Sequence, residues 1–211
     1  MNLTSFTALL PVGALRLLCS TQVVAAINKH IIETIDASSF KTVWLEIPVG
    51  VMDIEVYDGD KIELDIKLEP RRRWFTWRPR NIHAVEIEIG TSGSVLVLGI
   101  DRDDLKQHWR VRLPAALALD VDVGVGDVRV IDFSNELNME VDVGTARVDV
   151  AHQDFRSIHV SSGVGDAILR GFQQSNESKR NFVSADAYYY GEGKHRIELE
   201  VGVGEAVVSA N

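Results

Sequence analysis

The sequence contains a single cysteine, Cys19, among its 211 residues. One cysteine forms no internal disulfide, so the fold must be held by its hydrophobic core. Proline and aromatic residues are also scarce, with 5 prolines and 7% aromatics. Basic residues are outnumbered by acidic ones, 22 against 31, which leaves a net charge of −9. This negative charge disfavours nucleic acid as a partner, because an acidic surface repels a phosphate backbone.

The N-terminal segment is nearly free of charge, since Arg16 is the only charged residue in residues 1–26. It ends on V-A-A at residues 24–26. Small residues at positions −3 and −1 suit signal peptidase, so we predict that residues 1–26 are a signal peptide and that the mature chain begins near Ile27. A buried amphipathic helix is the alternative, because no basic residue precedes Arg16. The longest uncharged run, residues 1–15, is too short for a membrane span of about 20 residues.

Apolar and polar residues alternate with a period of two from residue 42 onward. This period is typical of half-buried strands. The Asp58-Gly59 pair stands between two such runs and indicates a hairpin. Only residues 27–35 and 102–107 could be helical, so the pattern predicts an all-β chain. Residues 27–115 are expected to supply N-terminal strands and a cap.

The second half of the chain contains a repeat of about 20 residues. Its clear copies begin at Leu119, Met139, Ile158 and Ile197. The spacing leaves room for a degenerate copy at residues 181–190. Within the first copy, Val121, Val123, Val128 and Val130 are expected to point inward. Gly124 and Gly126 are expected to mark a corner, because glycine adopts positive φ without steric cost.

Stacked copies of this length predict a right-handed parallel β-solenoid with rungs of about 20 residues. Residues 116–211 would form the repeat solenoid, and residues 27–115 would cap its N-terminal end. A loop at residues 70–80 interrupts the cap. The two parts together are expected to form one domain.

Several short motifs resemble those of the DUF4097 family of adhesin-like bacterial proteins. They are I-P-V-G at residues 47–50, Y-D-G-D-K-I-E-L at 57–64, R-V-R-L-P at 110–114 and V-G-V-G-D at 123–127. The resemblance runs from about residue 43 to the C-terminus, and it implies a β-solenoid in an exported or envelope-associated protein. The chain departs from the family pattern at the missing copy near Asn181 and at the insertion of residues 70–80.

That insertion, P-R-R-R-W-F-T-W-R-P-R, holds five arginines and three aromatic residues in an otherwise acidic protein. Arginine binds phosphate and carboxylate groups, and tryptophan suits a membrane interface or the face of a sugar. An acidic glycan, a lipid headgroup or an acidic protein of the envelope would be the partner. The alternative is a loop that folds back, with its tryptophans packed and its arginines paired. The candidate binding residues are Arg71, Arg72, Arg73, Trp74, Trp77, Arg78 and Arg80.

Other motifs give weaker indications. Asp127, Asp166 and Glu205 share one position of the repeat, and we interpret them as solvated carboxylates rather than a calcium site. The six histidines lack zinc-ligand spacing, so we predict neither metal nor cofactor. Tyr188-Tyr189-Tyr190 could be an exposed stacking platform for sugars or the apolar filling of the degenerate copy.

Taken together, these patterns predict a non-catalytic exported protein of the bacterial envelope that acts as a binding module or scaffold. It would reside in the periplasm, in the outer membrane or at the cell surface, with no membrane span of its own. One alternative is a structural protein that self-assembles into homo-oligomers through exposed strand edges. The other is a polysaccharide-active β-helix enzyme, although the sequence indicates no catalytic pair of carboxylates.

Overall fold

The computed structural model describes residues 28–71, 81–151, 154–172, 177–180 and 183–210. The predicted signal peptide, residues 1–26, lies outside the described residues. The described part is all-β and contains one short 3₁₀ turn, η1 (Ile82–Ala84). Its first six strands are β1 (Lys29–Asp36), β2 (Thr42–Tyr57), β3 (Lys61–Pro70), β4 (Glu88–Ser92), β5 (Val95–Gly99) and β6 (Leu105–Pro114). The other six are β7 (Ala118–Phe133), β8 (Leu137–Val150), β9 (Phe155–Arg170), β10 (Glu177–Arg180), β11 (Ala185–Tyr190) and β12 (His195–Ala210).

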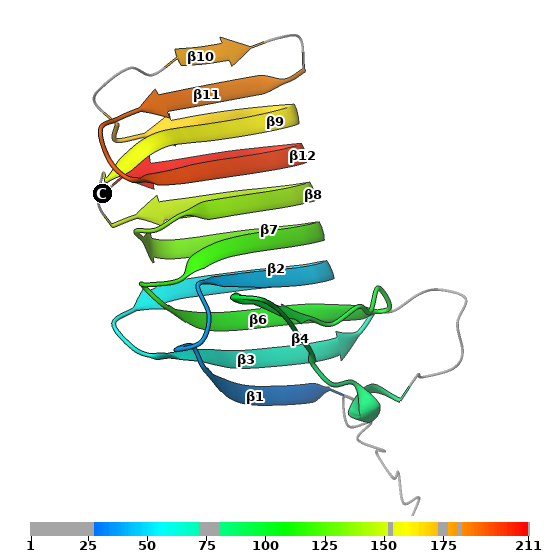
Figure 1. The fold of residues 1–211 in the computed structure, drawn as a ribbon. Coiled ribbons are helices and arrows are strands. Elements are labelled where there is room, and N and C mark those ends of the chain that lie inside the picture. The colour runs from blue at the N-terminus through cyan, green and yellow to red at the C-terminus, as the bar shows by residue number, and fades with distance from the viewer. Residues whose placement is uncertain (1–27, 72–80, 152–153, 173–176, 181–182, 211) are drawn as a thin grey trace, which may run out of the picture.

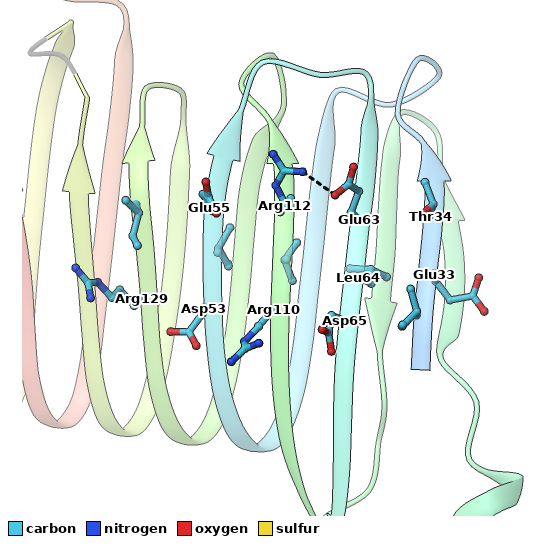
Figure 2. A pocket seen from close by; sticks show the side chains of 14 residues that line it. Glu33, Thr34, Asp53, Glu55, Glu63, Leu64, Asp65, Arg110, Arg112 and Arg129 are labelled. Carbon is cyan, nitrogen blue, oxygen red and sulfur yellow. Dashed lines mark hydrogen bonds and ion pairs between the residues drawn. The ribbon is translucent and has the colours of Figure 1, made fainter. Parts of the chain in front are cut away.

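Five long strands form the centre of the sheet in the order β2-β7-β8-β12-β9, and each neighbouring pair is parallel (Figure 1). Each strand bends near its middle and returns along a U-shaped path, as Figure 2 shows for several of them. Residues before the bend therefore form a first layer, and residues after it form a second layer. The pairing of β2 shows the division, because β5 pairs with Thr42–Glu46 and β6 pairs with Gly50–Tyr57.

The core lies between the two layers and is built largely by alternation of buried and outward-facing residues along the strands. In β7 the predicted inward residues Val121, Val123, Val128 and Val130 are all buried. Parallel register stacks them on equivalent apolar residues of β2 and β8, so continuous apolar columns run through the protein. Burying one such side chain contributes about 1.5–3 kcal/mol. The repeat therefore stabilises the fold through the core, as its alternation predicts.

Antiparallel strands extend the sheet at both ends. Strands β3 and β1 continue the second layer beyond β6, and β4 continues the first layer beyond β5. At the opposite end β11 and β10 follow β9 (Figure 1). The predicted all-β class is confirmed, but the sheet is open and mixed rather than parallel throughout.

Two local expectations were wrong. Residues 29–36 form strand β1 instead of a helix, because pairing with β3 turns Ile31 and Ile35 toward the core. The expected degenerate copy at residues 181–190 is no parallel rung: β11 runs antiparallel to β9 and pairs with β10. Because β11 occupies one edge of β9, the last copy, β12, pairs with the other edge and lies between β8 and β9.

The bends carry a column of glycines, one from each long strand: Gly50, Gly126, Gly144, Gly204 and Gly165. Neighbouring backbones approach so closely here that a Cβ on Gly126 would overlap the carbonyl oxygen of Gly50. The predicted corner is confirmed, but its cause is only partly positive φ. Gly144, Gly165 and Gly204 have φ of 145° to 148°, whereas Gly124 and Gly126 do not adopt positive φ.

Candidate functional site

A groove of about 480 Å³ crosses the outer face of the second layer, over strands β1, β3, β6, β2 and β7 (Figure 2). Three arginines line it, Arg110 and Arg112 from β6 and Arg129 from β7. We call it the arginine groove. Carboxylates of the two strands beside β6 flank the arginines, namely Asp53 and Glu55 from β2 and Glu63 and Asp65 from β3, and Glu33 of β1 lines the groove at the edge of the sheet.

Strand register sets the order of these charges. Antiparallel pairing of β3 with β6 places Asp65 opposite Arg110, and parallel pairing of β2 with β6 places Asp53 on the other side. Because alternate residues of a strand share one face, the same order of acidic, basic and acidic side chains across the three strands recurs two residues further along. That second row consists of Glu63, Arg112 and Glu55. Opposite charges on neighbouring strands stabilise a sheet by roughly 0.2–1 kcal/mol per pair.

Arg112 is engaged within the protein. Its Nη1 donates a hydrogen bond to Glu63 Oε2 at 2.9 Å, and the guanidinium lies 4.2 Å from the centre of the Tyr57 ring. The hydrogen bond to Glu63 raises the pKa of Arg112 above its ordinary value. This arginine therefore organises the rim of the groove and is the less available of the two on β6.

Arg110 is placed differently, because each carboxylate beside it has a histidine partner. His108 Nε2 lies 3.0 Å from Asp53 Oδ2, and His30 Nε2 lies 2.7 Å from Asp65 Oδ1. The bond with His30 lowers the pKa of Asp65 below its ordinary value, and Arg110 contributes to the same shift. Arg110 itself is exposed and makes no ion pair with any residue that the structure describes.

Arg129 forms the far side of the groove. Its Nη2 donates a hydrogen bond to Asp149 Oδ2 of β8 at 3.3 Å, and more than half of its side chain is exposed. The groove thus presents one unpaired guanidinium, from Arg110, with a weakly held second one, from Arg129, two strands away. An oxyanion bound by Arg110 could also contact Arg129, since guanidinium groups bind carboxylate and phosphate with paired N–H donors.

The predicted binding segment begins at the end of β3, on the strand that also supplies Glu63, Leu64 and Asp65 to the groove. Arg71, its first arginine, is exposed, and its backbone N–H donates a hydrogen bond to Asp104 O at 2.9 Å. It follows the end of β3, where Pro70 pairs with Leu105 of β6. The other predicted residues, Arg72, Arg73, Trp74, Trp77, Arg78 and Arg80, lie outside the described residues. Their role stays a prediction.

The exposed side chains between Arg71 and the groove are of both signs, with Lys67 and Glu69 on β3 and Lys106, opposite Glu69, on β6. The half-buried His108 lies between Lys106 and Arg110 on the same face of β6. Sequence reasoning missed this group of side chains and missed Arg110. The available signal was the alternation R-V-R at residues 110–112, which shows that two arginines share a face but not which carboxylates flank them.

The repeated carboxylates lie in one row across the strands at the bends, in the order Asp127, Thr145, Glu205 and Asp166, so Thr145 separates Asp127 from the other two carboxylates. Glu205 Oε2 accepts a hydrogen bond from Arg147 at 2.7 Å. Within the described ranges, no group of three or more acidic, histidine or cysteine side chains is arranged to hold a metal ion.

A second hollow, of about 550 Å³, lies on the outer face of the first layer. Its charged lining is acidic, with Glu46, Glu88, Asp101 and Asp122 and no basic side chain. The two hollows therefore differ in character: arginines line the one on the second layer, whereas the charged lining of the one on the first layer is acidic and would repel an anion.

In the part of the chain that the structure describes, no helix is long and apolar enough to cross a membrane. No family model matches the chain, and no curated protein matches it. The resemblance to the DUF4097 family therefore stays a prediction.

A solved structure is similar to this one. It is a "putative cell adhesion protein" from Clostridium sporogenes, with a TM-score of 0.52 and 15% identity over 87% of this chain and 100% of that chain. The likeness concerns the fold alone. "Putative adhesin" structures from Bacteroides fragilis and Parabacteroides distasonis also cover 87% of this chain, at 10% and 9% identity. Their TM-scores of 0.24 and 0.27 are too low to carry an argument.

Proposed function

We propose that this chain is a non-enzymatic, exported protein of the bacterial envelope that binds an acidic ligand. Recognition takes place in the arginine groove, and the arginine-rich residues 71–80 contribute further contacts. The ligand offers carboxylate or phosphate oxygens, as an acidic glycan or an anionic lipid headgroup does. The protein acts as a binding module of the adhesin type.

The observation that carries this proposal is the state of Arg110. A guanidinium beside two carboxylates would ordinarily pair with them, yet His30 and His108 take up those carboxylates instead. The guanidinium of Arg110 therefore lies at the surface between two carboxylates, and it forms an ion pair with neither of them. A bound oxyanion would gain charge-assisted hydrogen bonds from Arg110, which are stronger than neutral ones.

The scaffold suits recognition by a preformed surface. In this proposal the central parallel strands act as a right-handed β-solenoid, and the antiparallel strands at each end protect it from edge-to-edge pairing. Residues on a hydrogen-bonded sheet are held more firmly than residues on loops, which lowers the entropy lost on binding. The name of the Clostridium sporogenes protein agrees with a role in adhesion, as an analogy drawn from the fold.

The binding test compares Arg110→Gln with Arg156→Gln. Arg156 is an exposed arginine of β9, outside the groove, so both variants remove one surface positive charge. The probes are polygalacturonate, vesicles of phosphatidylglycerol in phosphatidylcholine, and neutral dextran. Arg110→Gln should weaken binding to an acidic probe by about tenfold, the equivalent of 1.4 kcal/mol. Arg156→Gln should bind as the wild type does.

The two acidic probes distinguish glycan from lipid as the source of the oxyanion. Binding should also weaken as salt is raised from 50 to about 500 mM, because exposed charges are screened. Equal binding by both variants, with unchanged melting temperatures, would show that the groove is not the site. A combined glutamine variant of the arginines in residues 71–80 measures the contribution of that segment separately.

Export is tested by cell fractionation followed by intact mass measurement. The proposal predicts a species that begins near Ile27 in the periplasmic or outer-membrane fraction. A full-length species recovered only from the cytosol would exclude the envelope role, whatever the groove binds.

A further inference from the structure

Three aromatic rings lie parallel on the outer face of the first layer, at the end of the sheet farthest from the arginine groove. The rings of His159 on β9 and Tyr188 on β11 stack with centroids 4.5 Å apart and planes within 5°. The Tyr190 ring is parallel to that of Tyr188, with centroids 6.4 Å apart and planes within 3°. We call these three side chains the tyrosine platform. Strands β9 and β11 adjoin each other near one end of the ribbon in Figure 1.

Alternation along β11 explains which tyrosines reach the surface. Ala185, Ala187 and Tyr189 are buried, and Tyr189 packs against Phe172 at 4.9 Å between centroids. Tyr188 and Tyr190 therefore point to the opposite face, and 54% of Tyr190 is exposed. The buried Tyr189 therefore fills the core, and Tyr188 and Tyr190 form a surface, for which a role in sugar binding stays a prediction.

Polar groups of both kinds surround the platform. The His159 ring nitrogens lie 3.4 Å from Asp186 Oδ1 and 3.4 Å from Glu198 Oε1. Arg196 Nη1 lies 4.0 Å from Glu198 Oε2. Register places the half-buried Ser157 opposite Tyr190 and next to Arg196. Hydrogen-bond donors and acceptors thus stand together beside aromatic rings, and each carboxylate has a cationic or imidazole neighbour.

We propose that the tyrosine platform is a binding site for a neutral saccharide. A sugar ring has a face of C–H groups, which contact the negative face of an aromatic ring, and a rim of hydroxyls that both donate and accept hydrogen bonds. The exposed Tyr190 ring supplies the surface for the C–H face. Asp186, Glu198 and Ser157 are positioned to accept from the hydroxyls, and Arg196 to donate to them.

The charge at the platform distinguishes this ligand from a cation. Aromatic rings with unpaired carboxylates would suit a quaternary ammonium group. Here both carboxylates already contact the His159 ring, and Arg196 also lies near Glu198, so neither carboxylate is left without a polar partner inside the protein. A cation would therefore give up its hydration without gaining an unpaired carboxylate, whereas a neutral ligand rich in hydroxyls replaces the hydrogen bonds of the water that it displaces.

This inference is independent of the proposed function. The platform and the arginine groove share no residue, lie on different layers and use opposite chemistry. An acidic glycan bound in the groove would depend on Arg110, whereas a neutral glycan on the platform would depend on Tyr190. A result that excludes binding at one site therefore does not exclude binding at the other.

The test screens the whole chain against an array of neutral glycans built from hexoses, deoxyhexoses and N-acetylhexosamines. The best-bound oligosaccharide is then titrated by calorimetry against three variants. Tyr190→Ala should bind about tenfold more weakly or worse, while Tyr190→Phe should stay within about threefold of the wild type, because it keeps the ring. Trp44→Ala is the matched control, since Trp44 is 39% exposed on the same layer near the other end of the sheet.

Three results would overturn the proposal. The first is an array on which no neutral glycan binds. The second is a glycan that Tyr190→Ala and the wild type bind equally well. The third is displacement of the glycan by choline chloride at matched ionic strength, which would indicate a site for cations. Melting temperatures of the variants exclude unfolding as the cause, and the wide exposure of Tyr190 makes its replacement mild for the core.

Discussion

Replacing a glycine of the bend column tests how closely the long strands approach. A Cβ at Gly144 would fall far inside the 3.0 Å limit of real Cβ contacts, against the carbonyl oxygen of Gly126, and the φ of Gly144 is 148°. The Gly144→Ala protein must therefore separate two hydrogen-bonded strands and also hold alanine in a conformation that side chains disfavour. Both effects should lower the free energy of unfolding.

The size of the effect follows from three other glycines, each with a subset of these constraints. Gly126 has the overlap without positive φ, so Gly126→Ala should cost about 1–3 kcal/mol from overpacking. Gly93 has φ of 60° but open space, so Gly93→Ala should cost about 1–2 kcal/mol from strain. Gly90 has neither, with Val97 Cβ at 3.6 Å, so Gly90→Ala should be neutral or slightly stabilising. For Gly144→Ala the two costs add to about 2–5 kcal/mol.

The assay is urea unfolding of all four variants, followed by far-UV circular dichroism and by tryptophan fluorescence, to which the fully buried Trp109 contributes. The expected order of stability is Gly90→Ala, Gly93→Ala, Gly126→Ala and then Gly144→Ala. If Gly144→Ala and Gly126→Ala unfold with the same free energy as Gly90→Ala, the backbones do not approach as described. If Gly93→Ala is the only variant that loses stability, backbone strain at positive φ, and not the close approach of neighbouring strands, is the dominant constraint.

Two further predictions concern polar groups. Gln107 is fully buried, where its Nε2 donates to Ile100 O at 2.8 Å and its Oε1 accepts from Trp109 Nε1 at 2.9 Å. Gln107→Leu should lower the free energy of urea unfolding by about 2–4 kcal/mol, because it leaves two buried groups unsatisfied. An unchanged unfolding midpoint would contradict this. The lowered pKa of Asp65, caused first by its bond with His30, adds stability above the ordinary value of 3.8 that is lost as pH falls through the folded-state pKa. His30→Ala should therefore be less stable than the wild type at pH 5 and converge with it at pH 2, and a difference independent of pH would refute this cause.

Much of the fold can be predicted from the sequence, because alternation is a local property. The period of two identifies the strands, and it places the valines of residues 121–130 correctly in the core. The glycines of the repeat correctly mark the bends. Strand order is not local: β12 lies between β8 and β9, and β11 turns antiparallel, because each strand takes whichever edge its neighbours leave open.

The candidate site was harder to predict for the same reason. Arg110 is far in the sequence from Asp53, Asp65 and His30, and only the register of β1, β3, β6 and β2 brings them together. The arginine-rich segment is conspicuous in the sequence because its residues are adjacent. A groove assembled from five strands leaves no such local signal.

The position of β12 has a consequence for folding during synthesis. This strand follows β9 by 25 residues in the chain, yet it fills the centre of the sheet, hydrogen-bonded to β8 and β9 on its two sides. Until it emerges, those two strands have no partner between them and expose unpaired edges. The sheet therefore cannot close progressively from the ribosome outward, and its central pairing waits for the last strand of the chain.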